Sequence, residues 1–249
     1  MKRFLIVFLL IALVFSSISE AQRPRPARPR ASAQASNCPT PLNDITDCPD
    51  EGCGITFDSN LNLRKNIRSD DQTPVPKTLE DMKELDDPVN FTKGDTREEL
   101  TALGEGQKVR VVAFALVARK GGAESCNCKL TKVADTDNHI VLVDPTLRRP
   151  ALAADEEDSE TAEFTPRVRL DHPNLSRAKL QPLITAAANQ ALRVRVTGLL
   201  LFDSEHFLGN HLKRHNNWEI HPVLGLEFCP RGKRCTAASD ANWKSLEAQ

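Results

Sequence analysis

Alternating and continuous runs of apolar residues in the second half of the chain predict most of its secondary structure. Two runs, residues 109–118 and 139–143, are apolar enough to be buried strands. Three further segments are typical of strands, and one of them, residues 161–170, places Glu163, Thr165, Arg167 and Arg169 on one face. Apolar residues at helical spacing follow a capping Asn174 or Ser176. We therefore expect strands at 109–118, 139–143, 161–170, 192–202 and 218–228, and a helix at 176–191.

The order of these elements is strand, strand, strand, helix, strand, strand. Over residues 107–229 this order resembles the OB-fold, a five-stranded Greek-key barrel with one helix between its third and fourth strands. The resemblance implies a mainly β protein that contacts its ligand across the second and third strands. The loops between strands one and two and between strands four and five would frame that ligand. Another small barrel or an α+β sandwich is the alternative.

A Cys-containing, loop-rich region at residues 37–106 is expected to precede the barrel, and a tail at 230–249 to follow it. Residues 37–75 have many turn-forming residues and little periodicity, which suggests a subregion held by a disulfide. Two short helices are expected after it. One follows a capping Thr78 and extends to residue 85, and the other begins at Asp95 or Thr96 and ends at Gly104.

The first 21 residues have the pattern of a cleavable secretory signal peptide. Two basic residues precede a twelve-residue apolar stretch and a short segment of small residues, which predicts cleavage before Gln22. An uncleaved anchor is the alternative, but a bilayer requires about 20 apolar residues. Residues 22–36, rich in Pro and Arg, read as a flexible linker. We expect an exported protein, secreted or periplasmic, with no membrane span in the mature chain.

Export makes the seven cysteines informative, because disulfides persist in oxidising compartments. An odd number leaves at least one thiol free, bound to metal or paired with another molecule. Cys229 and Cys235 flank a short loop after the last strand, and we expect a disulfide between them. The pairing of the remaining five, Cys38, Cys48, Cys53, Cys126 and Cys128, stays open at this stage.

The distribution of charge and aromatic residues argues against nucleic acid as the partner, although many OB-folds bind it. From residue 37 onward, 27 Lys and Arg stand against 33 Asp and Glu, a net charge of about −6 that repels a polyanion. Binding of single strands also uses exposed aromatic side chains as stacking platforms. The chain has no Tyr, and Phe207 is the one aromatic residue in the candidate loops outside the predicted strands.

The chemistry of the chain concentrates in the two loops that would frame an OB-fold ligand, residues 120–139 and 203–221. Five of the six histidines lie in or beside these segments. Since side chains on adjoining strands and loops of a barrel can meet at one face, we expect them to converge. The candidate ligand-binding residues are Asp135, Asp137, His139, Asp203, His206, Glu219 and His221.

A divalent metal is the cofactor that these side chains suit, because imidazoles with carboxylates are ligands for Zn, Mn or Fe. Asp135, Asp137 and His139 alternate, so on extended chain they would point to one side. The candidate metal ligands are His139, His206 and His221. Long polar loops also collect His and Asp simply because they are solvated, and the spacing matches no established metal motif.

Two functions are compatible with these observations. The first is an exported binding or interaction module that contacts an unknown ligand through residues 120–139 and 203–221. It is favoured because no recognisable catalytic motif or spacing is present, and catalytic residues are therefore not assigned. The alternative is a metal-dependent hydrolase of the nuclease or phosphodiesterase type that uses the same His and Asp residues.

Overall fold

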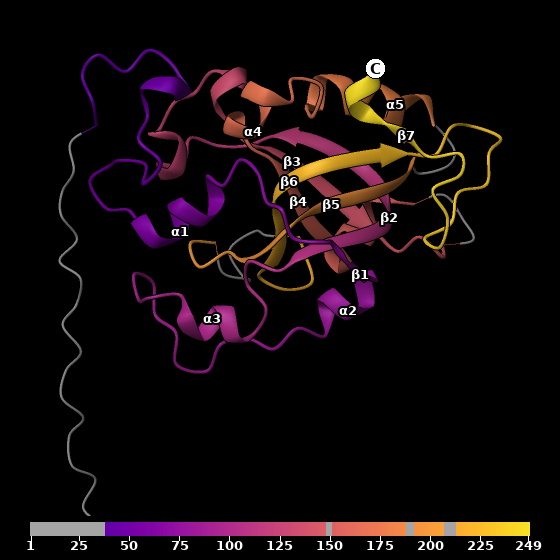
Figure 1. Ribbon diagram of the computed structural model, residues 1–249, viewed down its shortest axis with the longest axis horizontal. Coiled ribbons are helices and arrows are strands. Elements are labelled where there is room, and N and C mark those ends of the chain that lie inside the picture. Colours follow the sequence, from indigo (N-terminus) through magenta and orange to yellow (C-terminus); the bar gives the residue numbers. More distant parts are fainter. Residues whose placement is uncertain (1–37, 148–150, 188–191, 207–212) are drawn as a thin grey trace, which may run out of the picture. The chain divides into compact units, whose positions relative to one another are not determined.

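Five strands close into a barrel in the computed structural model, which describes residues 38–147, 151–187, 192–206 and 213–249 (Figure 1). The signal peptide and linker expected at 1–36 lie outside the described residues, as does part of the loop that contains His211. The barrel strands are β2 (Lys108–Lys120), β3 (Asn138–Val143), β4 (Glu160–Phe164), β5 (Leu192–Phe202) and β6 (Trp218–Phe228).

The strand order is that of an OB-fold. Strand β2 pairs antiparallel with both β3 and β5, and β3 pairs antiparallel with β4. Strand β4 then pairs parallel with β6, and β6 pairs antiparallel with β5, which closes the ring. The mainly β, OB-fold-like architecture expected from the order of elements is thus confirmed.

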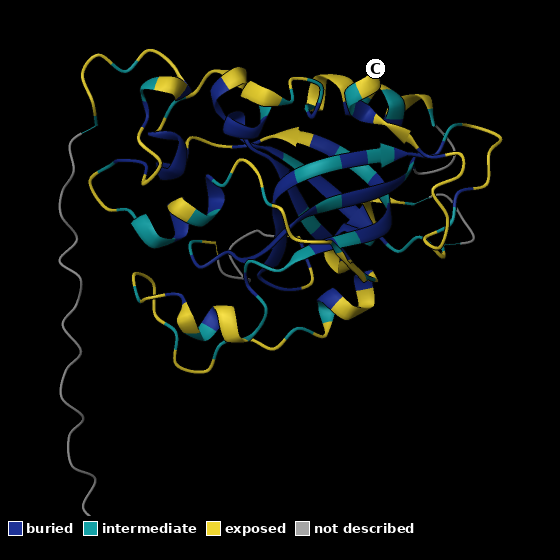
Figure 2. Cartoon of the chain, viewed as in Figure 1, coloured by how far each residue is buried: buried dark blue, intermediate teal, exposed yellow. Residues whose placement is uncertain are grey.

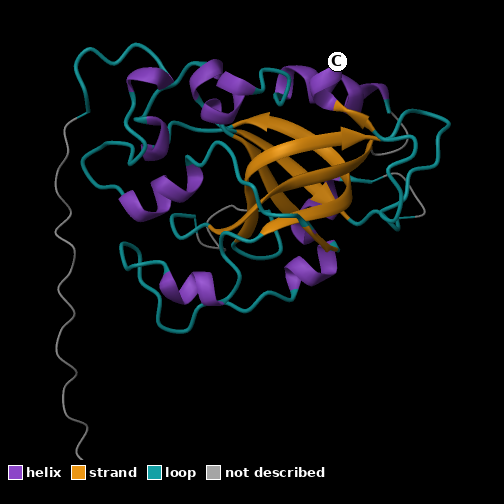
Figure 3. Cartoon of the chain, in the orientation of Figure 1, coloured by secondary structure: helices purple, strands orange, loops and turns teal. Residues whose placement is uncertain are grey.

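Helices and two short additional strands surround this barrel (Figure 3). Between β4 and β5 there are two helices where one was expected. Strand β1 extends the sheet beside β2, and β7 pairs with β6. The helices are α1 (Ser59–Lys65), α2 (Leu79–Lys83), α3 (Glu98–Ala102), α4 (Pro166–Asp171) and α5 (Arg177–Ala186), and the short strands are β1 (Val75–Lys77) and β7 (Lys244–Ser245).

The strand expected at 161–170 is wrong beyond Phe164. Thr165 ends the extended segment, because its side chain accepts a hydrogen bond from the backbone N–H of Val168 and caps α4. Pro166 occupies the first helical position, where its missing N–H costs nothing. Arg167 and Arg169 therefore lie on a helix and do not share a strand face with Glu163.

The other helices correspond to their predicted segments with small differences. Thr78 caps α2 as expected, in a reciprocal capping box with Asp81. Helix α3 begins after Arg97, later than predicted. Helix α5 ends at Ala186, and residues 188–191 of the predicted helix lie outside the described residues. Helix α1 was not predicted, because residues 59–65 alternate polar and apolar positions with no clear helical stripe.

The barrel interior is mainly apolar, with Glu160 as a buried acid, and alternation along the strands decides which side chains enter it. Ile140, Ala162, Phe164 and Ile220 belong to the buried core, together with side chains from β2 and β5 (Figure 2). Their neighbours along β3, β4 and β6 point to the outer face of the barrel. On that outer face the sequence places polar side chains, which the N-terminal region and the β2–β3 loop then bury.

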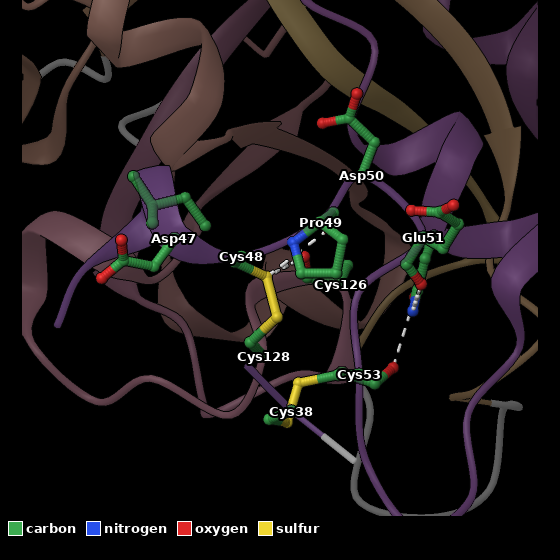
Figure 4. The surroundings of a disulfide bond; sticks show 12 residues. Cys38, Asp47, Cys48, Pro49, Asp50, Glu51, Cys53, Cys126 and Cys128 are labelled. Carbon is green, nitrogen blue, oxygen red and sulfur yellow. Dashed lines mark hydrogen bonds between the residues drawn. A yellow bond between two sulfur atoms is a disulfide. The ribbon is translucent and has the colours of Figure 1, made fainter. Parts of the chain in front are cut away.

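Disulfides hold the N-terminal region and the β2–β3 loop together. Cys38 is bonded to Cys53, and Cys48 is bonded to Cys128 in the β2–β3 loop, 80 residues away in sequence (Figure 4). The third disulfide joins Cys229 to Cys235 after β6. Cys126 is a free, buried thiol. The Cys48–Cys128 bond therefore ties the N-terminal region to the loop that precedes β3.

Candidate functional site: a buried cluster of histidines and carboxylates

Four polar side chains share the outer face of neighbouring strands. His139 on β3 lies directly opposite Glu163 on β4. Glu219 on β6 is aligned with Thr161, two residues before Glu163, and His221 follows two residues later on the same face of β6. Strand register therefore brings both histidines to Glu163 from opposite sides. This is the face across which an OB-fold contacts its ligand.

The β2–β3 loop and α1 add charged groups above this face. Asp137 immediately precedes β3, and Glu124 precedes the short 3-10 helix Ser125–Asn127. Lys65, the last residue of α1, reaches Glu124 with an Nζ–Oε2 distance of 2.9 Å. We call Glu124, Asp137, His139, Glu163 and His221 the inner cluster.

Distances within the inner cluster are short. His139 Nε2 lies 3.4 Å from Glu163 Oε1 and 3.9 Å from Glu124 Oε1. His221 Nδ1 lies 3.0 Å from Glu219 Oε1 and 3.3 Å from Glu163 Oε2. The closer contact to Glu219 orients the His221 ring, which leaves its other nitrogen, Nε2, directed away from that carboxylate.

Four buried atoms of the inner cluster have no hydrogen-bond partner among the described residues: Asp137 Oδ1, His139 Nε2, Glu163 Oε2 and His221 Nε2. Asp137 and His221 are each 1% exposed, and Glu163 is 4% exposed. Burying a polar atom without a partner costs about 1–3 kcal/mol. Four such atoms in one place are unusual, and each carries a lone pair that suits a metal ion.

The pKa values in the inner cluster follow from burial and from like charges. Burial, reinforced by the carboxylates of Glu219 and Glu124, raises the pKa of Glu163 well above its usual value. Burial and Glu124 likewise raise the pKa of Asp137. Burial lowers the pKa of His139 and favours the neutral ring, which is the form that ligates metals. A cation bound here would stabilise both carboxylates in their ionised form.

A second group of charges, Lys65, Asp203, His206, Arg214 and Glu219, adjoins the inner cluster, and we call it the flanking network. Arg214 donates to Glu219 Oε2 at 3.0 Å and to Asp203 Oδ2 at 3.2 Å. His206 Nδ1 lies 2.9 Å from Asp203 Oδ2. Although burial opposes its ionisation, the charges of Lys65 and His206 hold the pKa of Asp203 well below its usual value. This network is internally paired.

The structure brings three of the seven candidate binding residues, Asp137, His139 and His221, into the inner cluster. Glu219 orients His221, while Asp203 and His206 belong to the flanking network. Asp135 is elsewhere: it ends the 3-10 helix Val133–Asp135, and its Oδ1 accepts a hydrogen bond from the backbone of Ile45. Because that turn interrupts extended chain, Asp135 does not point with Asp137 and His139.

Of the three histidines expected to ligate a metal, His139 and His221 are placed to do so and His206 is not. In the described part of the chain, the groups of potential ligands lying within 4.8 Å of one another do not include His206. The sulfurs of Cys38, Cys53 and Cys128 also lie within 4.8 Å of one another, but all three are in disulfides.

Sequence reasoning missed Glu163 and Lys65 as site residues. Glu163 sits in a strand whose polar face looked solvated, and its position opposite the start of β3 was the signal that could have identified it. No local signal marks Lys65, because its partner Glu124 is 59 residues away. Glu124 was recognisable only as an acid beside Cys126.

The free thiol adjoins the inner cluster. Cys126 Sγ lies 3.6 Å from Glu124 Oε2 and 3.8 Å from Asp137 Oδ2. Burial and these two carboxylates raise the pKa of the thiol well above its usual value. Cys126 is therefore an unreactive thiol in this arrangement.

Comparisons with known proteins add little to this description. No protein-family model matches the chain, and a search of curated proteins gave no match. Among solved structures, the chain is similar to Entamoeba histolytica asparaginyl-tRNA synthetase in complex with asparaginyl-adenylate, with 11% identity and a TM-score of 0.29. The match covers 68% of this chain and 26% of that one. So weak a likeness carries no argument about function, and the OB-fold assignment depends on strand order.

Proposed function

We propose that this protein is an exported binding module whose OB barrel holds a divalent transition metal in the inner cluster. The observation that carries the proposal is the set of four buried, unpartnered atoms on Asp137, His139, Glu163 and His221. Each of these four residues belongs to a group of potential ligands in which one atom from every member lies within 4.8 Å of the others. In two of these groups one imidazole lies with two carboxylates, a set that suits Zn²⁺, Mn²⁺ or Fe²⁺ better than Ca²⁺ or Mg²⁺, which prefer oxygen ligands.

Export is the cellular setting of the proposal and is supported by the N-terminal sequence. A basic start, a twelve-residue apolar stretch and small residues before Gln22 have the order of a signal peptide. The disulfides of the described chain suit an oxidising compartment. Among the described residues, none of the helices is long and apolar enough to cross a bilayer.

Binding is favoured over hydrolysis because most of the proposed metal ligands are covered. The side chain of His139 is 37% exposed, whereas those of Glu163 and His221 are 5% and 0% exposed. A phosphodiester would have to reach a metal beneath this cover and beside several carboxylates, which repel it. The same acidic surroundings disfavour nucleic acid as the partner.

Metal binding to the chelator-treated protein tests the proposal. The protein, dialysed free of chelator, is titrated with Zn²⁺ or Mn²⁺, and bound metal is measured by mass spectrometry after gel filtration. We expect stoichiometric binding and a higher Tm, because a ligand that binds only the folded state stabilises it. Asp137→Asn should bind less metal per chain than the wild type. His215→Gln, a control at a histidine paired with Asp158, should keep it. No binding by the wild-type protein refutes the proposal.

A further inference from the structure

The inner cluster is larger than one metal ion requires. Three groups of potential ligands overlap within it: Asp137, Glu163 and His221 form one, Glu124, His139 and Glu163 a second, and Glu124, Cys126 and Asp137 a third. Glu163 belongs to the first two. Each of these two groups has a histidine of its own. Within the described chain, such groups never contain both histidines.

We propose that the site holds two divalent metal ions, one beside His221 and one beside His139, with the carboxylate of Glu163 bridging them. This inference rests on the proposed metal-binding function and extends it from one ion to a dinuclear centre. The ion beside His221 would also take Asp137, and the ion beside His139 would also take Glu124.

The two oxygens of Glu163 face different histidines. Oε1 lies 3.4 Å from His139 Nε2, and Oε2 lies 3.3 Å from His221 Nδ1, the ring nitrogen that also contacts Glu219. On the His221 side, the support for an ion comes from the group of Asp137, Glu163 and His221, which place one potential ligand atom each within 4.8 Å of the others. Two ligands bound to one ion at about 2.1 Å are separated by about 3.0–3.4 Å in octahedral or tetrahedral geometry. The His139–Glu163 spacing thus already suits a shared ion. A carboxylate with one oxygen toward each ion matches metal pairs separated by about 3.5–4 Å.

Excess negative charge in the surrounding region attracts cations. Five carboxylates lie in the inner cluster and flanking network, and Lys65, Arg214 and His206, whose pKa Asp203 raises, pair with them. With His206 protonated and the other two histidines neutral, two negative charges are left over. This charge favours bound divalent cations, and the geometry around Glu163 is what supports a second ion.

Space for the ion beside His139 is kept by a glycine. A Cβ added to Gly121 would lie 2.9 Å from His139 Nε2 and 2.9 Å from the carbonyl oxygen of Asp137. Any side chain at this position would therefore occupy the space next to the unpartnered nitrogen.

Metal stoichiometry and electron paramagnetic resonance with Mn²⁺ test the dinuclear centre. The metal-free protein is loaded with Mn²⁺, passed through a desalting column and analysed for metal per chain. We expect two ions per chain and the spectrum of an exchange-coupled pair. His139→Asn and His221→Asn should each retain one ion and give the six-line spectrum of isolated Mn²⁺, and His172→Asn should behave as the wild type.

The outcomes separate this inference from the function on which it rests. One Mn²⁺ per chain in the wild type, or two without exchange coupling, overturns the dinuclear centre and leaves metal binding standing. No bound Mn²⁺, Zn²⁺ or Fe²⁺ overturns both. If His221→Asn does not fold, the partly exposed His139 still provides the test: His139→Asn with two coupled ions refutes the proposal. Folding of each variant is checked by its thermal transition and by its intact disulfides.

Discussion

Replacing Lys65 by Met should destabilise the metal-free protein strongly, because it leaves a buried carboxylate without its cation. Lys65 Nζ and Glu124 Oε2 are 2.9 Å apart, and their side chains are 2% and 10% exposed. Removing one partner of a buried ion pair costs about 3–5 kcal/mol. Met keeps most of the length and apolar stem of the lysine, so the loss reports the charge rather than a cavity.

The pKa of Glu124 gives a second estimate of the free energy that the Lys65–Glu124 pair contributes to folding. Burial opposes its ionisation, but the charge and hydrogen bond of Lys65 outweigh burial and lower the pKa from 4.5 to about 2. A difference of this size corresponds to about 3 kcal/mol. Because the folded pKa is the lower one, this stability is present above about pH 4.5 and is lost as pH falls toward 2. In Lys65→Met, stability should respond less steeply to acid over this range.

Urea unfolding at pH 7 in the presence of a chelator, with disulfides intact, measures the effect. Lys83→Met is the matched control, because Lys83 pairs with Asp158, whose side chain is 66% exposed. Such a pair contributes at most about 1 kcal/mol. Adding Glu124→Gln to Lys65→Met should recover part of the lost stability. Equal losses in the two lysine variants, or no recovery in the double variant, would refute the reasoning.

Three further predictions concern two buried groups and the N-terminus. The buried Cys126 thiol should resist iodoacetamide in the native protein at pH 8 and react as one thiol per chain in urea; equal rates in both states would contradict its burial. Burial raises the pKa of Glu160 to about 8, so its contribution to stability is full below about pH 4.5 and is lost as pH rises through 8. Glu160→Gln should therefore flatten the loss of stability between pH 5 and 9 in urea titrations, and an unchanged slope would count against this assignment. Protein recovered from an exporting host should have the intact mass of a chain beginning at Gln22, whereas a species retaining Met1 would disprove cleavage.

The barrel could be predicted from sequence because the buried positions of its strands are occupied by apolar residues, which form recognisable runs or alternate with polar ones. Apolar runs and alternation located β2, β3, β5 and β6 within one or two residues of their ends. The third strand was predicted too long, since alternation continues past Phe164 while Thr165 and Pro166 form a helix start. Local capping chemistry outweighed periodicity at that point.

The site was only partly predictable because its burial comes from distant segments. Alternation along the strand correctly placed Glu163 on the face opposite the apolar core. It did not indicate whether that polar face is buried or exposed to solvent. The Cys48–Cys128 disulfide and the end of α1 turn it into a buried cluster by placing Lys65 above it. Neither contact leaves a periodic signal. The loop histidine His206 was an equally plausible ligand until its contact with Asp203 was known.

Anomalous X-ray diffraction from a crystal loaded with Zn²⁺ or Mn²⁺ tests the central claim most directly, because it locates each metal ion without assumptions about ligands. We predict strong peaks at bonding distance, about 2.0–2.2 Å, from Asp137, Glu163 and His221, with a second peak beside His139 Nε2. A map without peaks in the inner cluster, or with peaks only at histidines elsewhere on the protein, would contradict it.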